Sequence, residues 1–261
     1  MTPAAFKRSI RDLQVWCSSC MVAFSGADAI GVLIGAKRPS GTLVHTIAVH
    51  PDHRRQGHGR HLLASLGSKL AILGPPRIVA EVPEALAPAC ELFSACGYVQ
   101  EAVLTDYVSP SDSRGSATLA QGGQSSQGVA GFVIPVTIDD LAANGLLGEA
   151  HPQTCWERSV ETLTARKDDI AGLAVASDER LEAYILYVPH GAEAEIVLLR
   201  SLIEDGGARL TQLLAEPRAR GIRTFRFPKV HPAEISTERL ETLGFRPAGG
   251  HLLYAAKARS N

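Results

Sequence analysis

The stretch that decides the fold is HTIAVHPDHRRQGHGRHLL, residues 45–63. Its β-branched and apolar residues predict a strand that ends at Val49, and a polar turn follows. Gly57 and Gly59 then precede an apolar periodicity that predicts a helix from about residue 59 to residue 73. A glycine-rich turn before a helix N-terminus gathers backbone N–H groups and the positive end of the helix dipole, an arrangement that favours a bound phosphate.

Three arginines in the same stretch strengthen the prediction of an anion site. Arg54, Arg55 and Arg60 add full charges that can pair with phosphate oxygens. The two glycines lack the third glycine of a dinucleotide-binding fingerprint, and no Gly-Lys-Ser/Thr follows them, so neither common nucleotide motif fits. The sequence predicts a local polyanion site of another kind.

The residues around this stretch predict a sheet with helices on its faces. Before it we expect a helix at 4–16 and strands at 21–24, 30–36 and 43–49; after it we expect a strand at 78–82, a helix at 87–95 closed by Gly97, and a strand at 98–108. Strands that alternate with helices after an initial run of strands are typical of the α/β or α+β class.

The motif Arg54-x-x-Gly57-x-Gly59 after Ile47-Ala48-Val49 resembles the pyrophosphate-binding motif of the GNAT superfamily of acetyl-coenzyme A-dependent N-acetyltransferases. The resemblance covers residues 20 to 108, and the Gly97-Tyr98 pair follows in the family's order. It implies that the strand binds the pantetheine arm and that the loop binds the pyrophosphate of acetyl-coenzyme A, the acyl donor. The expected coenzyme-binding residues are Ile47, Ala48, Val49, Arg54, Arg55, Gln56, Gly57, His58, Gly59 and Arg60.

A second, similar domain is expected after a linker. Residues 109–131 are dominated by Ser, Gly and Gln, which predicts a flexible connection between a domain at 1–108 and one at 132–261. The second half predicts helices at 139–147, 155–166, 207–220 and 233–242, and strands at 170–176, 181–188, 194–203, 222–227 and 250–256. ELFSACGY (91–98) and ERLETLGF (238–245) share one pattern, so we expect two tandem GNAT-like domains, each a mixed, mostly antiparallel sheet flanked by helices.

The second domain is expected to be degenerate. Glu204 and Asp205 stand where the first half has arginines, and a carboxylate beside a pyrophosphate is unfavourable, so we expect no coenzyme there. Its expected roles are to complete the fold of the first domain, to shape the acceptor site or to form a homodimer. Compared with the family, the first domain lacks the usual first strand and helix, so residues 1–110 alone are expected to be insoluble or molten.

Two residues are candidate bases for transfer of the acetyl group to an amine. The strand HTIAVH resembles that of arylalkylamine N-acetyltransferases, which implies that His45 acts as a base through water; by period-two alternation it shares a face with Ile47 and Val49. Glu81 is similar in placement to the glutamate base of ribosomal-protein alanine acetyltransferases. For each, the alternative is a hydrogen-bonded or solvated strand residue without a catalytic role.

The proton donor for the leaving thiolate is an open question. In the family a Tyr often precedes the Gly of the Gly-aromatic pair by four residues and an Asn precedes that Tyr by seven, but this chain has Phe93 and Leu86. Phenylalanine cannot donate a proton. Tyr98 and Tyr107 are the nearest hydroxyls in the sequence, and release of the thiolate directly to solvent is the other route.

Composition limits the partners and the compartment. The formal net charge of −1 provides no global attraction to nucleic acid or to a membrane surface, so we expect neither partner. The N-terminus has no apolar signal segment, and the longest apolar stretch, 29–36, is too short to span a bilayer. Five cysteines, an odd number, suit a reducing compartment, and a cytoplasmic location is expected.

Three other functions compete with this interpretation. The histidines at 50, 53, 58 and 61 straddle a turn and a helix start, so we expect no metal site. Trp16-Cys17-Ser18-Ser19-Cys20 has its strand on the wrong side for a thioredoxin-like motif. The strongest rival is a non-catalytic acyl-coenzyme A sensor or scaffold protein. The amine acceptor, a small molecule or a peptide, is not identified by the sequence.

Overall fold

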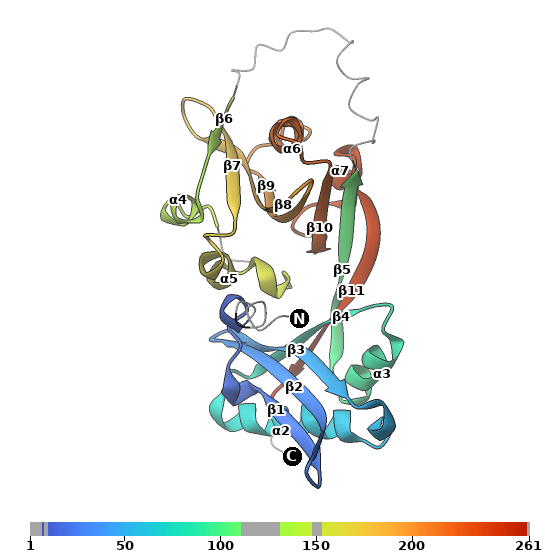
Figure 1. Ribbon diagram of the computed structural model, residues 1–261. Helices are drawn as coiled ribbons and strands as arrows, with labels where there is room; N and C mark the ends of the chain where they lie inside the picture. The colour runs from blue at the N-terminus through green and yellow to red at the C-terminus, as the bar shows by residue number, and fades with distance from the viewer. Residues whose placement is uncertain (1–6, 8–9, 111–130, 148–152, 260–261) are drawn as a thin grey trace. The chain divides into compact units, whose positions relative to one another are not determined.

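The computed structural model describes residues 7, 10–110, 131–147 and 153–259 (Figure 1). The chain divides into two compact units. Unit 1 consists of Met1–Val103 with Gly250–Asn261, and unit 2 consists of Leu104–Gly249. Each unit is a mixed, mostly antiparallel sheet with helices against it, which confirms the expected fold class.

Unit 1 has the strand order β1-β2-β3-β4-β11, and only the pair β3–β4 is parallel. Its strands are β1 (Met21–Ser25), β2 (Asp28–Arg38), β3 (Gly41–Val49), β4 (Arg77–Pro83) and the part of β11 (Arg246–Lys257) from Gly250 onward. Its helices are η1 (Cys17–Ser19), η2 (Pro51–His53), α2 (His58–Leu73) and α3 (Ala87–Ala95). The chain turns from β3 through η2 into α2, as the sequence predicts.

Unit 2 has the strand order β5-β10-β9-β8-β7-β6, and only the pair β9–β10 is parallel. Its strands are the part of β5 (Val99–Pro110) from Leu104 onward, β6 (Phe132–Pro135), β7 (Ala171–Ala176), β8 (Leu181–His190), β9 (Glu193–Ser201) and β10 (Thr224–Val230). Its helices are α4 (Ile138–Ala143), η3 (Trp156–Arg158), α5 (Val160–Ala165), α6 (Ala208–Ala219) and α7 (Thr237–Thr242).

The long helix of unit 1 is held to the sheet by a leucine stripe. Leu62, Leu66 and Leu70 recur every four residues and are buried against Ile78 and other apolar side chains of β4. Figure 1 shows α2 crossing the sheet beside β1, β2 and β3. This packing fixes the N-terminus of α2 at the end of β3.

Each unit takes one strand from the other half of the chain. In unit 1, β11 pairs with β4 from His251–Pro83 to Lys257–Arg77. In unit 2, β5 pairs with β10 from Pro110–Thr224 to Thr105–Val230. The units therefore differ from the expected domains 1–108 and 132–261, because the strand expected at 250–256 belongs to unit 1. Most of the expected linker, residues 111–130, lies outside the described residues.

Several predicted elements have other bounds. The helix expected at 4–16 lies partly outside the described residues, and it has ended before Val15, which forms a bridge with Ala36. The helix expected at 155–166 is two helices, η3 and α5, because the Ser159 side chain caps α5 by accepting a hydrogen bond from the Thr162 N–H. The helices expected at 139–147 and 233–242 are the shorter α4 and α7, and β6 was not predicted.

The strand exchange predicts that neither half of the chain folds alone. A fragment of residues 1–110 lacks β11, so the edge of β4 loses seven paired positions, and we expect an insoluble or molten product. Co-expression with residues 131–261 supplies that strand and should restore solubility and a dispersed amide spectrum. A dispersed spectrum from the 1–110 fragment alone would contradict the prediction.

Candidate functional site

The candidate site lies in unit 1, where β3 and β4 part. The two parallel strands pair at Thr42–Ile78 and Leu43–Val79, and no further pairs join them, although both strands are described over their full length. β2 pairs with the other edge of β3 as far as Val49. The end of β3 therefore presents one edge of its backbone that neither β2 nor β4 covers.

A bulge interrupts β3 just after the point of parting. Val44 pairs with Gly35 and Thr46 pairs with Ile34, so His45 is the extra residue between them. Ile47 packs against the apolar core under α2, whereas His45 is exposed. The bulge interrupts the period-two alternation of β3 at His45. The prediction that His45 shares a face with Ile47 and Val49 is therefore wrong.

A groove of about 760 Å³ opens at this end of β3. Its walls are the end of β3, the turn before α2, the first turn of α2, and one side of α3. The lining residues are Ile47, Ala48, Val49, His53, Arg54, Arg55, Gly57, His58, Gly59, Arg60, Leu86, Pro88, Ala89, Glu91, Leu92 and Ala95. The structure thus brings together nine of the ten expected coenzyme-binding residues. The exception is Gln56, whose amide donates to the Asp52 carbonyl at 3.1 Å.

Glycines allow the backbone to form this groove. Gly57, the N-cap of α2, has φ +87°, a left-handed conformation that costs glycine little. Glycine has no side chain with which to cap the first N–H groups of the helix, so these can meet an anion in the groove. A Cβ at Gly59 would lie 3.1 Å from Leu92 Cδ2, so glycine at this position permits the close packing of α3.

The three arginines of the groove have different surroundings. Arg54 Nε donates to the Val49 carbonyl at 3.0 Å, which ties this side chain to the end of β3. Arg55, with φ +62°, forms an exposed ion pair with Glu91 of α3 at 3.5 Å. Burial raises the pKa of Cys96, and the charge and hydrogen bond of Arg60 oppose that shift, which places Arg60 beside the thiol.

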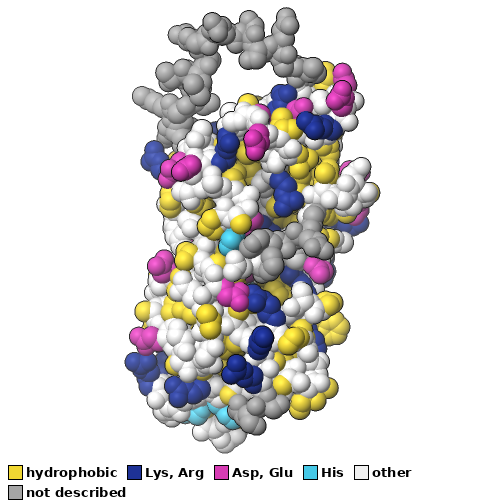
Figure 2. Space-filling model, turned by 180° about the vertical axis from the view of Figure 1, so that it is seen from behind, with side chains coloured by type: hydrophobic (Ala, Val, Ile, Leu, Met, Phe, Trp, Pro, Cys, Tyr) yellow, Lys and Arg dark blue, Asp and Glu magenta, His cyan; other side chains and the backbone are white. Residues whose placement is uncertain are grey.

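Three histidine rings lie close together at the same turn. The His53 ring lies 5.9 Å from that of His50 and 6.2 Å from that of His58, between ring centroids, and His53 and His58 line the groove. Figure 2 shows His and Lys or Arg side chains close together on the visible face of unit 1. Within the described part of the chain, no group of three or more His, Cys, Asp or Glu side chains is arranged to hold a metal ion.

The two candidate bases lie outside the lining of the groove. His45 is exposed at the bulge of β3, and Glu81 is half-buried on β4 opposite Leu253 of β11. Both side chains have interaction partners in the structure. One of them belongs to each of the two parted strands.

The position of the family's tyrosine is apolar and buried. Phe93 is 2% exposed and stacks on Tyr254 of β11, with ring centroids 5.8 Å apart. Burial raises the pKa of Tyr98, which packs edge-on against Phe93. Tyr107 belongs to unit 2, where its hydroxyl meets Thr237 Oγ1 at 2.8 Å. Sequence reasoning missed Tyr254, because it stands more than 150 residues from Phe93 and only the strand exchange brings the two rings together.

Comparison with known proteins finds a family match in the first part of the chain and similar folds over most of its length. Residues 3–98 match the model of the acetyltransferase (GNAT) family, and no curated protein matches the sequence. Among solved structures, a tandem GNAT protein from the clavulanic acid biosynthesis pathway has a TM-score of 0.64 at 18% identity, over 97% of this chain and 88% of that one. A GCN5-related N-acetyltransferase from Anabaena variabilis ATCC 29413 has a TM-score of 0.65 at 12% identity, over 99% of this chain and 67% of that one.

A third structure, a GCN5-related N-acetyltransferase from Sphaerobacter thermophilus, has a TM-score of 0.62 at 13% identity, over 92% of this chain and 81% of that one. The matched segment, residues 3–98, lies within unit 1, so this part of the chain is similar to the GNAT acetyltransferases. The fold of the chain is similar to that of a tandem member of the superfamily.

Two glycines of α2 provide a test of the close packing at the groove. Gly67→Ala should raise the free energy of unfolding by about 0.5–1 kcal/mol, since alanine favours a helix and a Cβ there meets only the Arg259 carbonyl at 3.8 Å. Gly59→Ala should gain less or lose stability, because its Cβ presses on Leu92. Urea unfolding of both variants measures the difference, and equal gains would contradict the geometry.

Proposed function

We propose that unit 1 binds acetyl-coenzyme A in the groove at the end of β3, and that the protein transfers the acetyl group to a primary amine of a small molecule or peptide. The observation that carries the proposal is that an uncovered strand edge, a glycine N-cap and three arginines line one groove. In this assignment the backbone of Ile47, Ala48 and Val49 pairs with the pantetheine arm as an added strand would. The first turn of α2 receives the pyrophosphate.

The reaction is a direct attack. The neutral amine attacks the thioester carbonyl, the carbonyl oxygen becomes an oxyanion, and the C–S bond then breaks to release the coenzyme thiolate. The proton lost by the amine goes to a base, and the thiolate takes a proton from the protein or from water. No metal is needed for these steps.

Residues on the two parted strands are the proposed bases. His45 stands at the bulge of β3 and Glu81 on β4, so either can face an amine placed between the strands. The ordinary pKa of histidine suits a base near neutral pH. We propose protonation of the thiolate from solvent, because the family's tyrosine position holds Phe93.

The buried Phe93 also favours a second candidate function. A protein that binds acyl-coenzyme A without transfer needs the groove but no proton donor, and Phe93 is 2% exposed. Such a sensor or scaffold would be stabilised by the coenzyme and would release no free thiol with any amine. Turnover separates the two functions.

Further proposals concern partners and location. The formal net charge of −1 supports a protein that binds neither nucleic acid nor an anionic membrane surface. Among the described residues, no helix is both long enough and apolar enough to cross a bilayer. A cytoplasmic location and a homodimer remain proposals that follow from cysteine content and from the tandem architecture.

Binding to the groove is tested by thermal stability. Excess acetyl-coenzyme A should raise the Tm of the native chain by several degrees, because a ligand bound only to the folded state stabilises it. Gly57→Glu should remove that rise, since it places a carboxylate at the anion site. Gly26→Glu, also at a glycine with positive φ but outside the groove, is the matched control and should keep the rise. No shift for the native chain would contradict the proposal.

The base is tested by the pH dependence of kcat/KM with an amine that is turned over. If His45 is the base, His45→Gln should lower kcat/KM by about 10²–10⁴-fold and remove the rise in rate near the pKa of histidine. Glu81→Gln should then leave the shape of the profile unchanged. The reverse pattern would assign the base to Glu81, and two unchanged profiles would exclude both residues.

A further inference from the structure

Unit 2 repeats the local architecture of the groove. β9 pairs in parallel with β10 at Glu193–Thr224, Ala194–Phe225 and Glu195–Arg226, and the two strands then part. A bulge in β9 leaves Val197 as the extra residue, as His45 is in β3. Gly207, the N-cap of α6, has φ +95°, close to the +87° of Gly57. The parted parallel strands, the bulge and the glycine N-cap of unit 1 are therefore present a second time.

The N-terminus of α6 is already occupied by a carboxylate. Asp205 Oδ1 accepts from the Gly207 N–H at 2.8 Å, and Oδ2 accepts from the Arg209 N–H at 2.7 Å. When the two glycine N-caps are aligned, Asp205 stands at the position of Arg55. The N–H groups that we assign to the pyrophosphate in unit 1 are thus bound in unit 2 to the chain's own anion.

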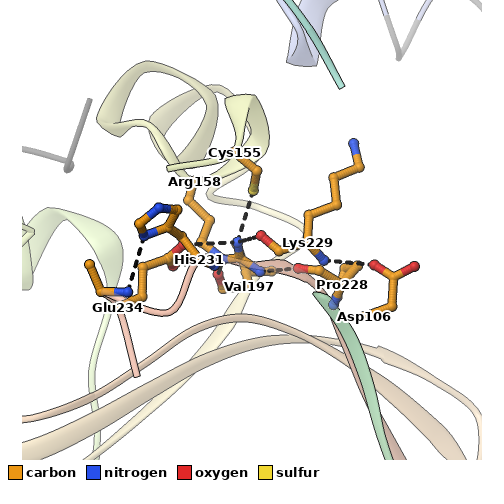
Figure 3. A network of polar contacts seen from close by, with 9 residues as sticks. Asp106, Cys155, Arg158, Val197, Pro228, Lys229, His231 and Glu234 are labelled. Carbon is orange, nitrogen blue, oxygen red and sulfur yellow. Dashed lines mark hydrogen bonds and ion pairs between the residues drawn. The ribbon is translucent and has the colours of Figure 1, made fainter. Parts of the chain in front are cut away.

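The gap between the parted strands is occupied as well. Arg158 of η3, whose side chain is 2% exposed, donates from Nε to the Val197 carbonyl at 2.9 Å. Its terminal nitrogens donate to the Lys229 carbonyl at 2.7 Å and to the Pro228 carbonyl. Figure 3 shows the guanidinium between these carbonyls. One side chain therefore joins the bulge of β9 to β10 across the gap.

Other contacts hold the guanidinium there. Arg158 forms an ion pair with Glu234 at 3.4 Å and donates a hydrogen bond to Cys155 Sγ at 2.9 Å. The Cζ of Arg158 also lies 4.8 Å from the ring centroid of Phe227. A buried charge with this many partners is costly to move, because its withdrawal would remove the ion-pair partner of Glu234 and the donor that several carbonyls share. Arg158 is therefore a fixed part of unit 2.

We propose that unit 2 is a closed copy of the groove, in which Asp205 takes the place of the pyrophosphate and Arg158 takes the place of the pantetheine between the strands. The protein then has one coenzyme site per chain, in unit 1. This inference rests on the proposed function for its comparison with unit 1. Asp205 and Arg158 are the two residues that close the copy. The sequence of the loop before α6 predicts the role of Asp205 but gives no sign of Arg158, which lies on η3.

The stoichiometry of binding by the full chain tests the inference. Calorimetric titration with acetyl-coenzyme A should give one molecule per native chain and none for Gly57→Glu. Two molecules per native chain, or one molecule bound by Gly57→Glu, would overturn the closed copy while leaving the proposed function intact. The absence of binding by the native chain would overturn the proposed function, and the measurement below would then decide the closed copy.

A second measurement uses inorganic phosphate and no coenzyme. In the Gly57→Glu background, Asp205→Ala should lower the Tm and should also make the Tm rise with added phosphate, which replaces the lost carboxylate. Asp140→Ala is the control, because it removes a capping carboxylate from α4, a helix that does not follow a pair of parted parallel strands. A phosphate response of Asp205→Ala no larger than that of Asp140→Ala or of the background would overturn the role of Asp205.

Discussion

The parting of two parallel strands is the constraint on which the rest of the structure depends. Parallel strands normally satisfy each other's backbone groups along their whole length, and β3 and β4 do so at only two positions. The uncovered edge of β3 must then find other partners or remain open to a ligand. The turn into α2 and the close packing of α3 at Gly59 place a helix N-terminus at the same point, so a strand edge and an anion site form one groove.

In unit 2 the parted strands find a partner within the protein. Its strands part after three positions, and a guanidinium with several N–H donors satisfies carbonyls on both sides of the gap. At this shared backbone arrangement, unit 2 has two side chains bound to the backbone, Arg158 from a short helix and Asp205 before a helix. Both are local changes that leave the sheet intact.

The sequence predicted the part of the site that depends on local chemistry. Gly57 and Gly59 determine a turn, and Arg54, Arg55 and Arg60 are adjacent to it, so nine of ten residues were placed in one groove. The features of the site that depend on pairing between distant strands could not be predicted from the sequence. The bulge at His45 is set by the register with β2, and the contact of Phe93 with Tyr254 is set by the pairing of β4 with β11. β6 was missed because four residues, of which two have exposed apolar side chains, give little periodicity.

The exchanged strands also determine the order of events during synthesis. β4 and its partner β11 are separated by about 170 residues, and contacts over such distances form late because the loop between them must first be closed. The groove is lined by residues between Ile47 and Ala95, yet the sheet that supports it is complete only when β11 has been synthesised. One edge of β4 therefore stays unpaired while the residues between β4 and β11 are synthesised, and the protein must keep that edge from pairing with another chain.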